Sequence, residues 1–348
     1  NHDYPALPFI YDRMYIFIRK CNLFIKKVNE NSNNFSPEWS QKRIAEARFL
    51  RAYYYHLAWM AYGGLPIIEK PLNRIEMGDS IFYPRATFEQ TFNYIVKELS
   101  EISDILPNEV GKGRVTKGAA LTLKGWCELF AGRYNEAAQT NQAVMDLGTY
   151  KLFDDYNAQF MMENNNNEES IFAYQHYPAS KPSGREDFFG PPGSYGGWGA
   201  MQPTQNLVDV YPMANGLPIS HQESGYDIIN PYKNRDPRFY ASIIYDGCVF
   251  AGKEYSLKRG DLYDPNNEYQ SGYFRRKGIG EHFTQATFTQ DGANYIFFRY
   301  AEVLLNYAEA KIELNQIDKT VLDAINAVRI RGGIPSLEES YKKSTFSQ

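Results

Sequence analysis

The feature that most constrains the fold is residues 46–72, a long apolar stretch that ends abruptly at Gly63 and Gly64. Its sequence, EARFLRAYYYHLAWMAYGGLPIIEKPL, repeats apolar residues at steps of three and four, which predicts one long helix. Ser36 and Pro37 are expected to start this helix, and the two glycines to end it. Its two apolar faces are Ala47, Leu50, Tyr54, Leu57 and Ala61, and Phe49, Tyr53, His56 and Met60. A helix that is apolar on two sides must be buried between neighbours, so other helices should pack around it.

The same periodicity predicts further helices on both sides of this stretch. They are expected at residues 7–29, 87–106, 116–130, 135–147, 295–314 and 321–331. Thr87 and Gln90 form a capping-box pattern, and Thr116 is the predicted N-cap of the helix that it opens. Because these helices follow one another as pairs, we expect them to stack into a curved solenoid.

One helical pair, GWCELFAGRYNEAAQTNQAV, has the signature of a tetratricopeptide repeat. Gly125 stands where two helices must approach closely, Gly132 begins the turn, and Ala137 is the small residue against which the second helix nests. The match is partial, because Leu121 replaces the aromatic residue that is usual near the start of the repeat.

Between residues 150 and 292 the helical period disappears, and Gly, Pro, Asn and Tyr become frequent. Alternating runs at 169–175 and 239–245 predict short strands. So long an excursion is usually functional or disordered, and its aromatic content argues against disorder. We therefore expect a mainly α fold, a tetratricopeptide-like solenoid of helical pairs with a large loop-rich insertion that carries short strands. The predicted division is a helical scaffold at 1–149, a ligand-binding region packed on it at 150–292, and a returning helical pair with a tail at 293–348, all in one structural unit.

Composition excludes several classes of function. The net charge of −4 over 348 residues does not favour a surface for duplex nucleic acid or for anionic membranes. Cys21, Cys127 and Cys248 are far apart and lack the spacing of a zinc site, so we expect neither a metal nor a cofactor. No apolar run is long enough to span a bilayer, and no signal peptide is present, although a chain that begins with Asn leaves the question of targeting open. The 28 Tyr, 22 Phe and 4 Trp fit either an aromatic core or a surface that stacks on ligands.

Five stretches together resemble the SusD/RagB family, whose members are lipoproteins that bind nutrients, most often glycans, at the outer membrane of Bacteroidetes-type bacteria. They are AEARFLRAYYYHLAWMAYGGLPII (45–68), the repeat at 114–147, NPYKNRDPRFYASI (230–243), FFRYAEVLLNYAEAKIEL (297–314) and AINAVRIRGGIP (324–335). The resemblance implies a tetratricopeptide-type scaffold and a loop-rich region packed on it. It also implies binding without catalysis, in a protein that lies as a lid over a TonB-dependent, SusC-like transporter.

The same resemblance implies a surface-exposed lipoprotein of the outer membrane. The signal sequence and the lipid-bearing Cys of the family are not in this chain, and Cys21 lies inside a predicted helix. Members also continue past the last matched stretch. We therefore expect a chain truncated at both ends, whose membrane attachment would need an anchor outside it.

A glycan site needs flat rings that stack on the apolar faces of sugars and polar groups that bind the hydroxyls. The loop 177–198 fits this need, because Tyr195 and Trp198 are carried on a Gly-rich backbone outside any helical stripe. Tyr177, Arg185 and Asp187 complete this predicted site. The alternative is that Trp198 plugs the loop onto the scaffold.

Other candidates have plainer explanations beside the functional one. Tyr4, with His2 and Asp3, is either a second ligand-binding group or a frayed terminus. Charged clusters at Glu46, Arg48 and Arg51 and at Arg299, Glu302 and Glu309 are interpreted as ion pairs between or along helices. The run 235–238 is interpreted as a charge-assisted turn, and Asp264, Asn266 and Glu268 as a solvated loop rather than a Ca²⁺ site.

Three functions compete at this point. The first is a glycan-binding protein that delivers oligosaccharide to the transporter. The second is a glycoside hydrolase, which needs two carboxylates across a sugar. The third is an adaptor that binds a peptide or glycopeptide on the concave face of the solenoid.

Overall fold

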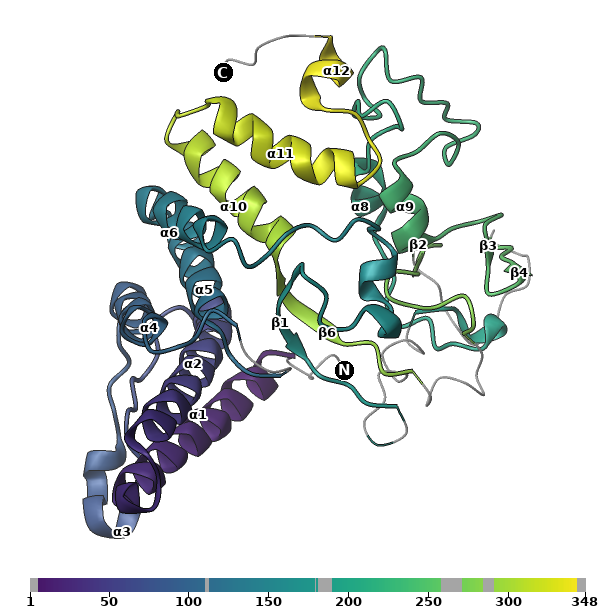
Figure 1. The fold of residues 1–348 in the computed structure, drawn as a ribbon. Coiled ribbons are helices and arrows are strands. Elements are labelled where there is room, and N and C mark those ends of the chain that lie inside the picture. Colours follow the sequence, from purple (N-terminus) through teal and green to yellow (C-terminus); the bar gives the residue numbers. More distant parts are fainter. Residues whose placement is uncertain are drawn as a thin grey trace. The chain divides into compact units, whose positions relative to one another are not determined.

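The computed structural model describes residues 6–109, 113–178, 180, 190–257, 271–283 and 291–342 (Figure 1). The chain forms two compact units, of which the first is Asn1–Thr149 with Glu309–Leu314 and the second is Tyr150–Ala308 with Asn315–Gln348. Among the described residues, no helix is both long enough and apolar enough to cross a bilayer. The three-part domain division made from the sequence stays a prediction.

The first unit is a succession of helices that pack in chain order (Figure 1). Its long helices are α1 (Ala6–Glu30), α2 (Pro37–Tyr62), α4 (Phe88–Ser103), α5 (Lys117–Phe130) and α6 (Tyr134–Asp146). Shorter turns are η1 (Ser32–Asn34), α3 (Arg74–Met77) and η2 (Gly78–Ile81). Helix α1 packs on α2, α2 on α4, α4 on α5 and α5 on α6. This order of contacts is the one expected for helical pairs that each bury the face of the pair before.

Helix α2 begins and ends where the sequence predicts. The Ser36 hydroxyl accepts a hydrogen bond from the backbone N–H of Trp39 at 3.2 Å, and Gly63 ends the helix with φ +71°. The predicted faces need correction. Three members of the first face, Leu50, Tyr54 and Leu57, are only half-buried, and Ala61 is exposed. Four fully buried residues, Ala52, Tyr55, Ala58 and Trp59, belong to neither face. Helix α2 is contacted by α1, α4 and α5, so it is covered on more than the two predicted sides.

The pair α5 and α6 packs as the repeat signature predicts. Thr116 caps α5 by accepting a hydrogen bond from the backbone N–H of Ala119 at 3.1 Å. A Cβ atom added to Gly125 would lie 2.7 Å from Nδ2 of the fully buried Asn141, and Ala137 is fully buried too. The two helices therefore approach so closely that only glycine fits at Gly125.

Ion pairs between helices account for Arg48 and Arg51. The buried Glu98 of α4 accepts hydrogen bonds from Nη2 of Arg48 at 2.7 Å and from Nη2 of Arg51 at 2.5 Å. Both arginines are on α2, so the interpretation as structural ion pairs between helices is confirmed. Glu46 pairs elsewhere, with Arg114.

The second unit consists of short strands, helical turns and a C-terminal helical pair. Strand β1 (Ser170–Tyr174) pairs with β6 (Tyr295–Arg299), β2 (Ile243–Ile244) with β5 (Phe274–Arg275), and β3 (Val249–Phe250) with β4 (Lys253–Glu254), all antiparallel. Its helices are η3 (Ala158–Phe160), η4 (Met162–Asn164), η5 (Gly193–Tyr195), α8 (Gln205–Val210), α9 (Pro237–Ser242), α10 (Tyr300–Glu313), α11 (Lys319–Arg331) and α12 (Leu337–Tyr341), and the part of α10 from Glu309 onward belongs to the first unit. The mainly α fold with short strands in the 150–292 region is confirmed.

Two predicted elements are wrong in part. Residues 239–245 were expected to form a strand, but most of them belong to α9, and only Ile243 and Ile244 pair with β5. Residues 295–299 were expected to begin a helix, but they form β6, and helix α10 starts only at Tyr300. Pairing with a distant strand decides the conformation of Ile243, Ile244 and β6, whereas residues 239–242 continue the helix that begins at Pro237.

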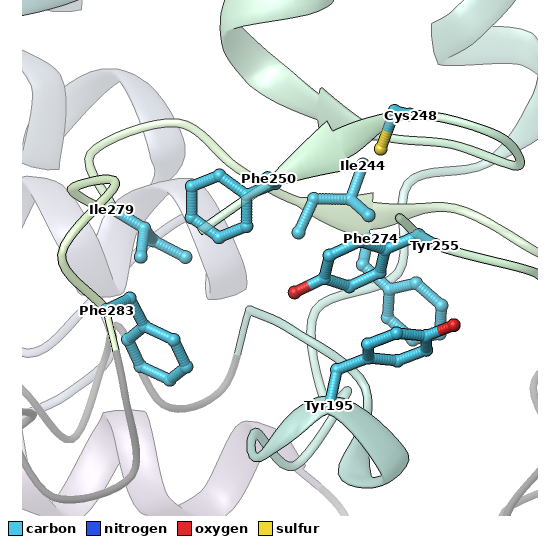
Figure 2. Packing of buried hydrophobic residues seen from close by; sticks show 8 residues of the cluster. All are labelled: Tyr195, Ile244, Cys248, Phe250, Tyr255, Phe274, Ile279 and Phe283. Carbon is cyan, nitrogen blue, oxygen red and sulfur yellow. The ribbon is translucent and has the colours of Figure 1, made fainter. Parts of the chain in front are cut away.

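A compact aromatic core lies in the second unit (Figure 2). Its members are Tyr195, Ile244, Cys248, Phe250, Tyr255, Phe274, Ile279 and Phe283. Tyr195 is 9% exposed, and its ring stacks on that of Tyr255 with ring centroids 4.1 Å apart. Its hydroxyl oxygen accepts a hydrogen bond from the backbone N–H of Ser256 at 2.9 Å. Tyr195 therefore anchors its own loop to the aromatic core.

Two charged clusters fix this unit internally. Asp236 caps α9 and binds the guanidinium of Arg238, as predicted for the 235–238 turn. Arg299 does not pair along helix α10 as predicted, because it belongs to β6. Instead it donates to Oε1 of the fully buried Glu169 at 2.8 Å, and Arg331 binds the same carboxylate.

Candidate ligand-binding site

A cavity of about 470 Å³ opens in the second unit beside the paired strands β1 and β6. Its apolar lining comes from Phe160, Met201, Pro203, Leu207, Tyr211, Ala293, Tyr295 and Ile296. Its polar lining comes from His176, Ser242, Arg275, Lys277, Asn294 and Arg299. An apolar cavity with a few polar groups is the usual form of a small-molecule site.

Two exposed tyrosines are paired across the two strands, and of these Tyr295 lines the cavity whereas Tyr174 does not. Tyr174 of β1 is in register with Tyr295 of β6, and their side chains are 46% and 50% exposed. The ring of Tyr174 meets His176 edge-on at 5.0 Å, and the ring of Tyr295 meets Phe297 edge-on at 5.2 Å. Exposed rings on a paired backbone form a firm surface on which a flat ligand can stack.

Asn294 holds the ends of the two strands together. Its Oδ1 accepts a hydrogen bond from the backbone N–H of His176 at 3.0 Å, and its Nδ2 donates to Oε1 of Gln175 at 3.1 Å. Its own backbone N–H donates to Oδ1 of Asn165 at 2.7 Å. The position of Tyr295 is therefore fixed by hydrogen bonds from both chain segments.

Lys277 brings a positive charge to the cavity wall. Its ammonium lies 4.3 Å from the ring centroid of Phe160 and 5.6 Å from that of Tyr156, which are cation–π distances. Burial lowers the pKa of Lys277, while the Tyr156 hydroxyl opposes that shift. Burial would raise the pKa of Tyr156, but the charges of Lys277 and Arg299 and a hydrogen bond with Ser242 together lower it.

Glu169 anchors the last of these cations. Its carboxylate is fully buried and accepts hydrogen bonds from Arg299, from Arg331 and from the backbone N–H of Phe153. Arg299 is thereby held at the cavity wall, with its guanidinium 5.9 Å from the ring of Phe160. A buried carboxylate needs such partners, because its desolvation is otherwise too costly.

The structure places the predicted site residues in three different ways. Trp198 and Tyr177 are 52% and 56% exposed, but neither lines the cavity. Tyr195 is packed in the core of Figure 2, which corrects the prediction that its ring is presented to a ligand. Arg185, Asp187 and Tyr4 lie outside the described residues, as do Asp264, Asn266 and Glu268.

Sequence reasoning missed the residues that line the cavity. Tyr295 was assigned to a helix, although the run YIFFR also suits a strand because it is rich in aromatic and β-branched residues. Lys277 carried no signal, since the last of three consecutive basic residues, followed by Gly278, looks like any exposed loop residue. Within the described ranges, no three His, Cys, Asp or Glu side chains are placed to hold a metal ion.

Two family models match different parts of the chain. The model described as "SusD family" matches residues 145–348, which is more than half of the chain. The model described as "Starch-binding associating with outer membrane" matches residues 2–124.

Curated relatives carry the same family name. A SusD-like protein of Bacteroides ovatus is 26% identical over 176 residues, which cover 47% of this chain and 32% of the relative. SusD-like protein P38 of Formosa agariphila is 22% identical over 347 residues, which cover 93% of this chain and 63% of the relative. The chain spans less than two thirds of the length of either relative.

Solved structures agree over nearly the whole chain. A SusD-like protein from Bacteroides fragilis is 29% identical with a TM-score of 0.79, covering 96% of this chain and 69% of that one. A SusD-like carbohydrate binding protein from the same species is 27% identical with a TM-score of 0.84, covering 97% and 67%. With the family model that matches more than half of its length, the chain belongs to the SusD family.

Proposed function

We propose that this chain binds an oligosaccharide at the cavity beside Tyr174 and Tyr295. The observation that carries the proposal is the pairing of the exposed Tyr174 with Tyr295, whose exposed ring lines a mainly apolar cavity that also has polar groups in its wall. Sugars offer apolar C–H faces to rings and hydroxyls to polar groups. The carbohydrate-binding description of the Bacteroides fragilis relative supports the same class of ligand.

Binding without hydrolysis is the form of the proposal that the cavity favours. A glycosidase places two carboxylates across the scissile bond. Of the described residues that line this cavity, none is Asp or Glu. Its polar wall offers donors instead, among them Asn294, Lys277 and Arg299.

A peptide or glycopeptide adaptor is the second candidate. A peptide that binds to a repeat protein uses an extended concave surface rather than one compact cavity.

Trp198 and Tyr177 are proposed as outer contacts of the glycan site, since both are exposed and within three residues of lining residues Met201 and His176. Arg185, Asp187 and Tyr4 stay predictions.

The wider role proposed is capture of the glycan at the outer membrane and its delivery to a TonB-dependent transporter. Membership of the SusD family and the outer-membrane description of the second family model support this role. Co-purification of the full-length lipoprotein with a transporter from the same membrane tests it. A lipoprotein that is extracted alone under conditions that keep other outer-membrane complexes together would count against it.

The binding proposal is tested by isothermal titration against a panel of neutral and acidic oligosaccharides. Tyr295→Ala should weaken the best ligand about tenfold, because a lost ring contact is worth about 1.4 kcal/mol. Phe82→Ala removes a ring of the first unit that is 69% exposed, against 50% for Tyr295, and serves as the control that should bind normally. No binding by any glycan, or new reducing ends on incubation, would refute glycan binding without catalysis.

A further inference from the structure

We propose that the cavity selects an oligosaccharide that carries a negative charge, a carboxylate or sulfate group that binds beside Lys277 and Arg299. The inference rests on the proposed function and names its class of ligand. It is drawn from the charges around the cavity, which are not balanced within the described part of the chain.

The first step is the partner of Lys277. No carboxylate of a described residue lies within ion-pair distance of its ammonium, whose neighbours are the rings of Phe160 and Tyr156. Lys277 is nevertheless one of the residues that line the cavity. A lysine charge held in a partly dry wall attracts an anion more strongly than one in open water.

The second step is the sharing of Glu169. One carboxylate serves both Arg299 and Arg331, so the group of three carries one positive charge in excess. Adding Lys277 makes that excess two before Glu302 is counted, a partly buried acid that interacts electrostatically with Arg299 but does not line the cavity. Arg299 uses its Nη1 for Glu169, and the planar guanidinium has further N–H groups with which to bind an anionic oxygen.

The third step is the location of the other nearby acids. Asp236 is bound by Arg238 and caps α9, so its charge is already matched. Asp291 accepts a hydrogen bond from the backbone N–H of Ala293 and faces His282 at 3.7 Å. Neither aspartate lines the cavity, so neither one neutralises Lys277 there.

A charged ligand would complete this arrangement. Its sugar ring would lie against Tyr295, and its anionic group would reach the cation pair across the cavity. A neutral sugar would leave the ammonium in the wall without a counter-charge. We therefore expect an acidic oligosaccharide to bind at least tenfold more tightly than the matched neutral one, with a preference that salt weakens.

The experiment uses two matched pairs of ligands and isothermal titration at low and high NaCl. Trigalacturonate is compared with its full methyl ester, and a monosulfated galactose disaccharide with its desulfated form. The proteins are the wild type, Lys277→Met, Lys277→Arg, and Lys253→Met as a control that removes an exposed lysine of β4. Circular dichroism and melting temperature establish that each variant is folded.

The inference predicts that the wild type binds the acidic member of a pair at least tenfold more tightly than the neutral member. Lys277→Met should remove most of this difference in affinity. Lys277→Arg and Lys253→Met should keep it. The inference would be overturned by equal affinities within both pairs, or by a difference in affinity that Lys277→Met leaves unchanged. Should Lys277→Met not fold, the wild-type margin at low and high salt decides alone. Binding of neutral glycans only would refute the charge selection and leave glycan binding standing, whereas no binding at all would refute both.

Discussion

Replacing His56 by leucine should change how the stability of the helical unit depends on pH. His56 lies on α2, is 3% exposed, and packs edge-on against Trp126 with centroids 4.6 Å apart. Neither ring nitrogen has a hydrogen-bond partner among the described residues. Burial lowers the pKa of His56 to about 3, although the Tyr53 carbonyl opposes the shift. The imidazole is therefore neutral in the folded protein over the whole range in which an exposed histidine titrates.

The sign of the effect follows from proton binding. In the unfolded chain His56 regains a pKa of about 6.5, so below that pH the unfolded state binds a proton that the folded state does not. Stability from this residue is therefore complete above pH 6.5 and falls as the pH drops toward 3. The slope is about 1.4 kcal/mol per pH unit, which amounts to about 2 kcal/mol between pH 6.5 and pH 5. Leucine binds no proton and removes this dependence.

Urea unfolding at pH 7.5 and pH 5.0, followed by tryptophan fluorescence, measures the effect. Trp39, Trp59 and Trp126 are in the first unit, so the signal reports chiefly on the helices around His56. The free energy of unfolding of His56→Leu minus that of the wild type should rise by about 2 kcal/mol from the higher to the lower pH. His56→Phe should show the same rise whatever its absolute stability. A difference that is the same at both pH values would refute the assignment of a neutral, buried imidazole.

Two further substitutions test the packing of each unit. Gly125→Ala should lower the free energy of unfolding by about 2 kcal/mol, because the added Cβ would lie 2.7 Å from Nδ2 of Asn141 in a fully buried contact. Asn141→Ala in the same background should recover part of that loss in urea unfolding, and a Gly125→Ala protein of wild-type stability would contradict the close approach. Glu169→Gln should lower the melting temperature of the second unit, at a cost of about 3 kcal/mol, because two arginines lose their shared buried charge. Glu168→Gln, at an exposed ion pair with Lys151, is the matched control, and equal melting of both variants would argue against the role of Glu169.

The helical unit was largely predictable because its signals are local. Helix caps depend on a few adjacent residues. The helix starts predicted at Ser36, Thr87 and Thr116 are confirmed by the structure. The close approach of two helices at Gly125 was predictable as well, because it is part of the repeat pattern, and the structure identifies Asn141 as the contact. Within this unit, periodicity was wrong only about which faces of α2 are buried, because three neighbouring helices cover most of its surface.

The second unit was less predictable because its elements depend on distant partners. Strand β6 is a strand through its pairing with β1, more than 100 residues earlier in the chain. The exposure of a loop tyrosine is decided in the same way. Tyr195 lies in η5 and Tyr295 begins β6, yet the first is covered by Tyr255 and the second is exposed beside a cavity. The Gly-rich run around Tyr195 led us to expect an exposed ring, and the residues after Tyr295 led us to expect a helix, so the local sequence was misleading in both cases.

Glu169 connects the architecture of the second unit to the proposed chemistry. It stands beside β1, and its carboxylate gathers Arg299 from β6 and Arg331 from α11, so one residue ties three elements together. A carboxylate buried this completely needs more than one donor, and the structure meets that need with two full positive charges. Two arginines therefore stabilise the one buried carboxylate of Glu169, and this leaves an excess of positive charge near the cavity wall. Lys277, which lines the cavity, adds to that excess. On this reasoning, charge selection is built into how the strands are anchored, and a relative that replaced Arg331 by a neutral donor should lose part of its preference for acidic sugars.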